Sequence, residues 1–126
     1  MASLSVGLNI DGAGGIISID LRDILFLKCN SYESQSILVY TKSGVYYILG
    51  PMRYWVKALN SSGCKLSITD RGTAVNVDNV TRLDRVLKTA YFKMDVESSL
   101  HCTIAFQRYR KIEQELLCIN PGIVVT

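Results

Sequence analysis

The sequence is short of the residues that most catalytic and metal sites require. It contains one histidine, His101, and four cysteines without a Cys-x-x-Cys pair. A tetrahedral zinc site usually draws its ligands from closely spaced pairs, so we expect no metal. The sequence also has no Gly-x-Ser-x-Gly motif and no glycine loop followed by Lys-Ser/Thr. These absences predict a protein that is not an enzyme and that needs no cofactor.

Long apolar runs are missing as well. No uninterrupted stretch approaches the ~20 residues of a membrane-spanning helix. The opening Met-Ala-Ser-Leu-Ser-Val has no basic segment ahead of an apolar one, so we expect no secretory signal. We therefore predict a cytoplasmic protein with no membrane partner.

The four thiols lie far apart in the sequence, at Cys29, Cys64, Cys102 and Cys118. In a cytoplasmic chain such residues are typically small buried hydrophobes. A redox-sensing pair, for example Cys64 with Cys102, is the alternative.

The size and charge fit one small domain. The chain has 126 residues, of which 48% are hydrophobic and 20% are charged, and its net charge is +3. This length predicts a single domain over residues 1–126. The mild positive charge permits nucleic-acid binding, but it is spread along the sequence, so folding must assemble any binding face.

Hydrophobic periodicity predicts a strand-rich, mainly β protein. We expect short antiparallel strands in small packed sheets. Apolar residues alternate over residues 4–10, and residues 11–15 form a glycine-rich turn. A continuous apolar run over residues 24–29 indicates a strand covered on both faces. Residues 42–44 connect a hairpin. The expected strands are 4–10, 16–19, 24–29, 37–40 and 45–49, followed by further short β runs after residue 65.

Two helices are expected. The first lies near residues 51–59, where Met52, Trp55, Val56 and Leu59 share one face. The second lies near residues 104–117 and closes the domain, with residues 119–126 as a tail. Its apolar stripe is Phe106, Tyr109, Ile112 and Leu116, and its polar side contains Gln107, Arg108, Arg110, Lys111 and Gln114.

Residues 69–80, Thr-Asp-Arg-Gly-Thr-Ala-Val-Asn-Val-Asp-Asn-Val, place a tight polar turn before an apolar pair closed by Asn76. This segment and the order of elements around it resemble the LytTR family of bacterial DNA-binding domains over residues 19–112. The family turn usually reads basic residue, any, His, any, Ser, aromatic. Here Ile68, Asp70, Gly72 and Thr73 occupy those places. The resemblance implies an elongated form with ten strands in three sheets. We expect a stand-alone domain with no receiver domain attached.

The resemblance also implies which residues face DNA. Arg71 lies at the apex of the turn, where a guanidinium can bond guanine O6 and N7, although a solvated arginine paired with Asp70 is the alternative. Asp70 itself can accept from cytosine N4, or it can cap the turn by bonding its own backbone, which we favour. We expect the amide of Asn76 to support the same turn.

Two further regions are candidates. The family places an arginine at or beside Gln107, so we expect Gln107, Arg108, Arg110 and Lys111 to contact bases and phosphates. A merely solvated helix face is the alternative. In the loop after Asn30, Ser34 and Gln35 could contact base edges or only form a solvent turn.

The function predicted from these residues is a sequence-specific regulator of transcription that reads double-stranded promoter DNA with loops. The resemblance implies paired copies, hence a homodimer, on direct repeats. The alternative is a protein-interaction module with the same fold that has lost DNA binding, which the departures at Ile68, Asp70, Gly72 and Thr73 favour. The DNA-binding hypothesis requires the Arg71 turn and the 107–111 cluster to lie along one edge.

Overall fold

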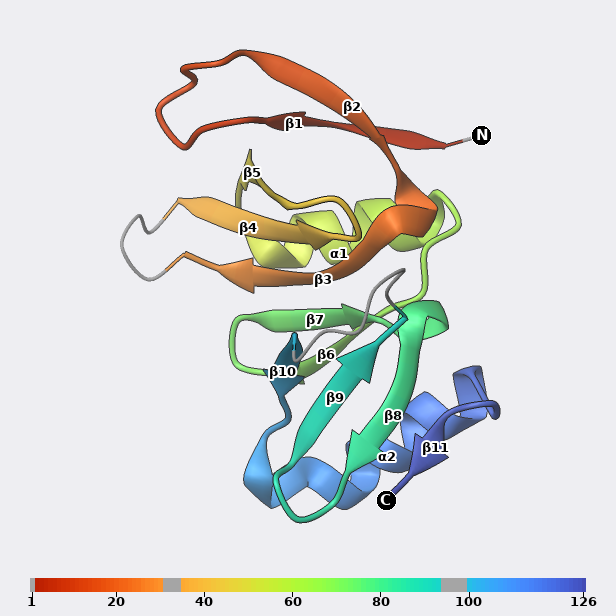
Figure 1. Cartoon of the computed structure of the whole chain (residues 1–126). Coiled ribbons are helices and arrows are strands. Elements are labelled where there is room, and N and C mark those ends of the chain that lie inside the picture. The colour runs from red at the N-terminus through yellow and green to blue at the C-terminus, as the bar shows by residue number, and fades with distance from the viewer. Residues whose placement is uncertain (1, 31–34, 94–99) are drawn as a thin grey trace.

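The computed structural model of the chain describes residues 2–30, 35–93 and 100–126. In these residues the strands form two sheets, in the order β2-β1-β5-β4-β3-β7-β6 and β10-β9-β8-β11 (Figure 1). The mainly β class is confirmed. The strands are β1 Ser3–Gly7, β2 Ile16–Asp20, β3 Ile24–Cys29, β4 Ser36–Thr41, β5 Val45–Leu49, β6 Leu66–Asp70, β7 Thr73–Asn76, β8 Val80–Asp84, β9 Thr89–Phe92, β10 His101–Thr103 and β11 Val124–Val125.

The number of sheets differs from the three that the resemblance implies. Strands β1 and β2 form an antiparallel hairpin, and a single residue pair, Gly7 with Tyr47, joins this hairpin to β5. That one pair merges two sheets into one of seven strands. The first strand also ends at Gly7 instead of residue 10, because residues 9–12 form a turn in which the N–H of Gly12 donates to the carbonyl of Asn9 (3.1 Å).

Strand β3 separates two hydrophobic cores and contributes to both. Leu25 and Phe26 belong to the core that also buries helix α2, and Ile24 and Leu27 belong to the core under helix α1. Both faces of the strand are therefore covered, as the uninterrupted apolar run predicts. We call these the α2 core and the α1 core.

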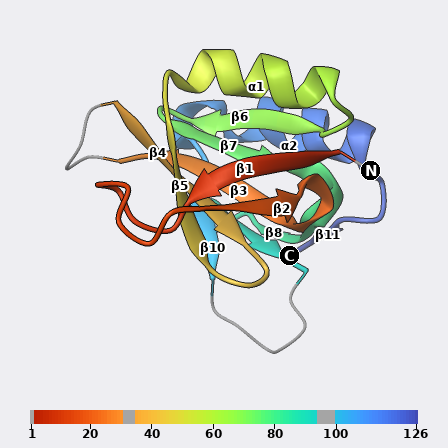
Figure 2. The same ribbon diagram turned by 90° about the horizontal axis from the view of Figure 1, so that it is seen from above.

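Helix α1 spans Met52–Ser61 and runs alongside β6 (Figure 2). Its predicted apolar face packs on the α1 core, with Leu59 fully buried. The side chain of Asn60 then accepts from the N–H of Leu66 (2.6 Å) and donates to the carbonyl of the same residue (3.0 Å). This pair of bonds fixes the start of β6 against the end of the helix.

Helix α2 spans Tyr109–Ile119 and begins later than predicted. The N–H of Ile104 donates to the carbonyl of Lys88 (2.9 Å) and that of Ala105 to the carbonyl of Thr69 (2.7 Å), so these residues are tied to neighbouring strands. A short 3-10 turn, η3, follows at Phe106–Arg108. Phe106 consequently lies outside the apolar stripe and is 76% exposed. That part of the prediction is wrong.

The expected tail belongs to the fold. Strand β11 pairs in parallel with β8, and Thr126 donates its N–H to the carbonyl of Leu83 (2.9 Å). Ile123 is buried in the α2 core. Within the described part of the chain, no helix is long and apolar enough to span a membrane.

The cysteines divide into two kinds. Cys64 and Cys102 are buried as predicted, whereas Cys29 and Cys118 are exposed, and all four are free. Cys64 belongs to the α1 core and Cys102 to the α2 core, so the suggested redox pair does not form. Burial raises the pKa of Cys102 to about 12, which keeps its thiol protonated.

Candidate nucleic-acid interface

The turn between β6 and β7 presents Arg71 to solvent. Asp70 pairs with Thr73 across the turn, after an irregularity in the register between Ile68 and Asp70. Gly72 has a φ of 76°, a left-handed conformation that suits glycine. Arg71 is exposed between them, so its side chain is available to a ligand.

The carboxylate of Asp70 supports this turn. It accepts from the backbone N–H of Arg71 (2.8 Å) and from the hydroxyl of Thr103 in β10 (3.1 Å). The first bond is the backbone capping that we favoured from the sequence. Among the described residues no ion pair engages the Arg71 guanidinium, so the paired-arginine alternative has no support in this geometry.

A second exposed segment adjoins the turn. Besides the Asp70 bond, Thr69 donates its hydroxyl to the carbonyl of Thr103 (3.4 Å) and accepts the N–H of Ala105 at its own carbonyl. A shallow pocket of about 590 Å³ lies between the two segments, lined by Asp70 and residues 103–108. We call residues 70–72 and 103–108 together the recognition edge. Figure 1 shows the β6–β7 turn and the chain before α2 on the same side of the molecule.

The 107–111 cluster is divided between two surfaces. Gln107 and Arg108 are exposed in η3 and line the recognition-edge pocket. Arg110 lines a different pocket, of about 390 Å³, together with Arg85 and Lys88. Lys111 is exposed in the first turn of α2. Only the first two therefore lie beside the Arg71 turn.

The model of the family described as the LytTr DNA-binding domain matches residues 14–116. The chain belongs to the LytTR family. It is a DNA-binding domain, and transcription regulation fits that family. A solved LytTr DNA-binding domain from Bacillus cereus is similar to it, with a TM-score of 0.65 and 14% sequence identity, covering 93% of this chain and 97% of that one. No curated protein matches the chain.

This LytTR domain has further features at the recognition edge that the sequence analysis missed or could not place. Lys28 is exposed in β3 opposite Thr73, directly beside the turn. Cys29 donates its N–H to the carbonyl of Gly72 (2.8 Å), so a thiol lies under the turn. Such neighbours come from strand pairing and leave no local signal in the sequence.

Of the two candidates in the loop before β4, only Gln35 can be placed. It is exposed, and its carbonyl accepts the N–H of Gly50 (2.7 Å). Ser34 lies outside the described residues.

Asn76 does not support the Arg71 turn. It stands at the opposite end of β7, pairs with Leu66 and donates its amide to the carbonyl of Ile24 (2.9 Å). The expectation was wrong because the partner of the amide lies in β3, which strand pairing brings alongside β7. Asn76 thus stabilises the packing of β7 against β3 and not the Arg71 turn.

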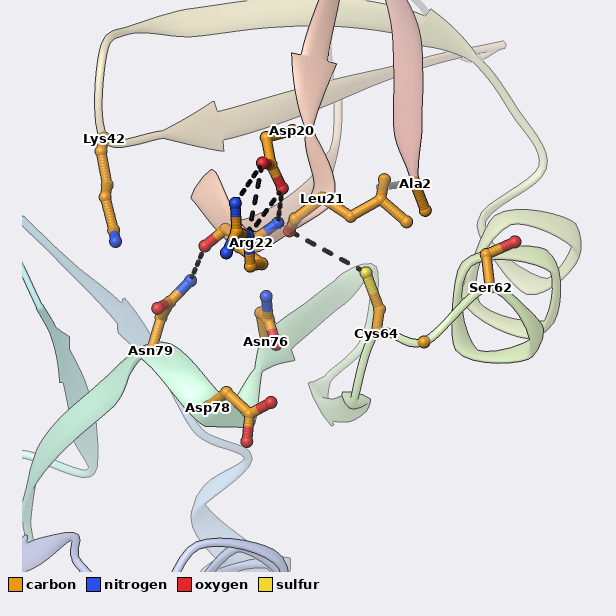
Figure 3. A pocket seen from close by; sticks show the side chains of 11 residues that line it. Ala2, Asp20, Leu21, Arg22, Lys42, Ser62, Cys64, Asn76, Asp78 and Asn79 are labelled. Atoms are coloured by element: carbon orange, nitrogen blue, oxygen red, sulfur yellow. Dashed lines mark hydrogen bonds and ion pairs between the residues drawn. The ribbon is translucent and has the colours of Figure 1, made fainter.

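Near Asn76, a pocket of about 390 Å³ lies between the N-terminal hairpin, the end of α1 and the 3-10 turn η2, Val77–Asn79 (Figure 3). On its wall Arg22 bonds Asp20 (2.9 Å) and holds the pKa of that carboxyl at about 2. Lys42 and Asp78 also line it. Across the described residues, no group of three or more His, Cys, Asp or Glu side chains is arranged to hold a metal ion.

Proposed function

We propose that the chain is a sequence-specific regulator of bacterial transcription that reads promoter DNA through the recognition edge. The observation that carries this proposal is the direct connection between its two polar segments. Hydrogen bonds of Thr69 and Asp70 with Thr103 join the Arg71 turn to β10, and the N–H of Ala105, directly before η3, donates to the carbonyl of Thr69. In this proposal a single duplex contacts both Arg71 and Arg108.

Each exposed side chain has a role in this proposal. Arg71 donates two hydrogen bonds to guanine O6 and N7, and Gln107 bonds adenine N6 and N7. Arg108 and Lys28 neutralise phosphates and fix the register of the domain on the duplex. Contacts with phosphates or flanking DNA come from four further residues: Arg110, Lys111, Ser34 and Gln35. Two copies on direct repeats, acting as a homodimer in the cytoplasm, complete the proposal.

A second function is supported by the carboxylate of Asp70. This acid lies in the middle of the recognition edge, where it repels phosphates, and Phe106 is exposed beside it. An exposed aromatic ring is typical of a protein interface, and the negative charge of the acid disfavours DNA. A protein-interaction module that has lost DNA binding is therefore the competing proposal.

Selection from a random pool of duplexes, followed by affinity measurement across a salt series, tests the proposal. We expect an enriched sequence and an affinity that falls steeply as salt rises, because phosphate contacts release counterions. Arg71→Ala should weaken binding about tenfold and relax discrimination at one base position. Lys42→Ala removes one charge at the pocket of Figure 3 and serves as the matched control.

Three results separate the alternatives. Loss of discrimination with Arg71→Ala and not with Lys42→Ala supports the reading role. If both variants weaken DNA binding equally and for every sequence, Arg71 contributes only its positive charge and does not read a base. Failure to enrich any duplex at low salt rejects DNA reading and favours the protein-interaction module.

A further inference from the structure

The turn between β8 and β9, residues 85–88 with sequence Arg-Val-Leu-Lys, displays two apolar side chains to solvent. Val86 is 85% exposed and Leu87 is 62% exposed. Val86 is the most exposed of the large hydrophobic residues in the described part of the chain. We call Val86 and Leu87 the apolar tip. Two adjacent apolar side chains with this exposure lose apolar surface to water if a ligand covers them, which would favour binding.

The backbone holds the apolar tip in place from several directions. One carboxylate oxygen of Asp84 accepts the N–H groups of both Val86 and Leu87, each at 2.9 Å. The N–H of Arg85 donates to the carbonyl of Thr126 (3.1 Å) and Lys88 has a φ of 55°. The tip is therefore presented in a fixed conformation, which lowers the entropic cost of binding.

The apolar tip adjoins the recognition edge. The carbonyl of Lys88 accepts the N–H of Ile104, and the ammonium of Lys88 lies 5.2 Å from the ring centroid of Phe106. Figure 1 shows the β8–β9 turn next to the chain that enters α2. Lys88, the residue after Leu87, thus joins the turn that carries the apolar tip to the recognition edge.

The surroundings of the apolar tip are cationic. Lys88 and Arg110 line one pocket with Arg85, and Arg85 is paired with Glu113 (3.0 Å). The other nearby acid, Asp84, is occupied by the turn and by Arg82 (3.8 Å). Two cations thus remain without an acidic partner among the described residues, beside two exposed apolar side chains.

Duplex DNA offers a surface that matches both features. The minor groove has phosphates on its rims and apolar sugar walls between them, and it accepts apolar wedges flanked by Arg and Lys. We propose that the apolar tip is a second DNA contact, which enters the minor groove beside the sequence read by the recognition edge. Leu87 and Val86 lie against the groove, and Lys88 and Arg110 bind its phosphates. This inference rests on the proposed function.

The test uses two duplexes that contain the selected sequence. The long one spans about four helical turns, and the short one spans about two turns and lacks the flanks. The double variant Val86→Ser and Leu87→Ser should bind the long duplex about tenfold more weakly and the short one as tightly as the wild type. Its matched control, Val45→Ser with Leu49→Ser, removes two exposed apolar residues from β5 and should change neither affinity.

A fluorescent base reports the contact directly. With 2-aminopurine in the flank, wild-type protein should raise the fluorescence because the apolar tip disturbs base stacking, and the double variant should not. Equal affinities of wild type and variant on both duplexes, with equal fluorescence, overturn the inference. On the short duplex, Arg71→Ala tests the proposed function alone. A failure of the proposed function can therefore be distinguished from a failure of the apolar-tip contact.

An anionic membrane surface is the competing partner for an apolar tip among cations. Flotation with vesicles of phosphatidylglycerol and phosphatidylcholine tests it. Vesicle binding that is lost in the double variant, together with unchanged DNA binding, overturns the DNA contact. If the wild type does not bind vesicles and the double variant binds the long duplex more weakly than the wild type does, the DNA contact is supported. Thermal unfolding of the variant at the wild-type Tm excludes misfolding as the cause of any loss.

Discussion

Strand β7 carries polar residues of two different kinds at its two ends. Before its first residue stand Asp70 and Arg71, whose side chains meet solvent or bond at the surface. At its other end stand buried amides. Asn76, the last residue of β7, donates to the carbonyl of Ile24 (2.9 Å), and Asn79 in η2 donates to the same carbonyl (2.7 Å) and to that of Arg22 (2.8 Å). One short strand therefore joins an exposed turn to a buried network.

The two ends of β7 therefore differ in role: the buried end holds the residues that identify the family, and the turn end holds the residues proposed to bind DNA. The Ala74-Val75-Asn76 signature, on which the LytTR resemblance rests, is buried and holds β7 against β3. The departures from the family pattern, at residues 68, 70, 72 and 73, all lie at the turn end. A substitution at the buried end should thus change stability, and one at the turn should change what is bound.

The largest effect is expected at the buried end. Asn79→Ala removes two hydrogen bonds and should lower the free energy of unfolding by about 2–3 kcal/mol, measured by urea denaturation. Asn76→Ala should cost less, because it removes one bond and because the Oδ1 of Asn76 is buried without a partner in the described structure. DNA affinity of the folded protein should not change. A comparable fall in affinity would show that the two ends are coupled.

Gly72→Ala tests the turn end. The left-handed φ of 76° disfavours a side chain, and a Cβ there would lie 3.2 Å from the Cβ of Cys29. We expect a loss of stability of about 1–2 kcal/mol, and a loss of DNA affinity because Arg71 moves with the turn. Gly63→Ala, at a φ of 108° with no atom within 4 Å of its Cβ, should lose stability only. Unchanged DNA affinity in Gly72→Ala would contradict the proposed role of the turn.

Much of the fold follows from local pattern. The apolar run of β3, the hairpin between β4 and β5, and the apolar face of α1 were all predicted, because burial imposes a period that a single element reveals. The start of α2 was not predicted correctly. It depends on the bond from Ala105 to Thr69, between segments distant in the sequence, which shifts Phe106 out of the helical stripe.

The candidate site shows the same division. That Arg71 tops an exposed turn follows from the residues around it. The partner of Asn76, however, is Ile24, 52 residues away, and the approach of Thr103 to Asp70 spans 33 residues. The apolar tip was also missed, since Val86 and Leu87 look like ordinary strand residues until their exposure is known.

A smaller effect is expected from Asp70→Asn. Asparagine keeps an acceptor for the Arg71 N–H and removes one negative charge from the recognition edge. DNA binding should strengthen a few-fold, by about 0.5–1 kcal/mol at low salt, and the gain should shrink as salt rises. Asp78→Asn, at the pocket of Figure 3, is the control and should change little. Weaker DNA binding by Asp70→Asn would contradict this expectation and would mean that the carboxylate contributes to the DNA contact, as an acceptor for cytosine N4 or as the support of the turn.

The smallest effect concerns acid stability beneath the apolar tip. Glu113 is 7% exposed and accepts two bonds from Arg85 (3.0 and 3.2 Å) and one from the hydroxyl of Tyr109 (3.1 Å). The bonds from Arg85, and then that from Tyr109, lower the pKa of Glu113 below its ordinary value of 4.5. Burial raises the pKa of Tyr109 to about 12, so this hydroxyl stays a donor.

A carboxyl with a lowered pKa stabilises the fold above its ordinary pKa and loses that contribution as pH falls through the folded value. The wild type should therefore lose stability below about pH 4.5 more steeply than Glu113→Gln, measured by urea midpoints between pH 7 and pH 3. The difference should be small, because the side chain of Arg85 is 63% exposed and solvent screens the pair. Parallel pH profiles would mean that the Arg85–Glu113 ion pair contributes no measurable stability at the base of the apolar tip.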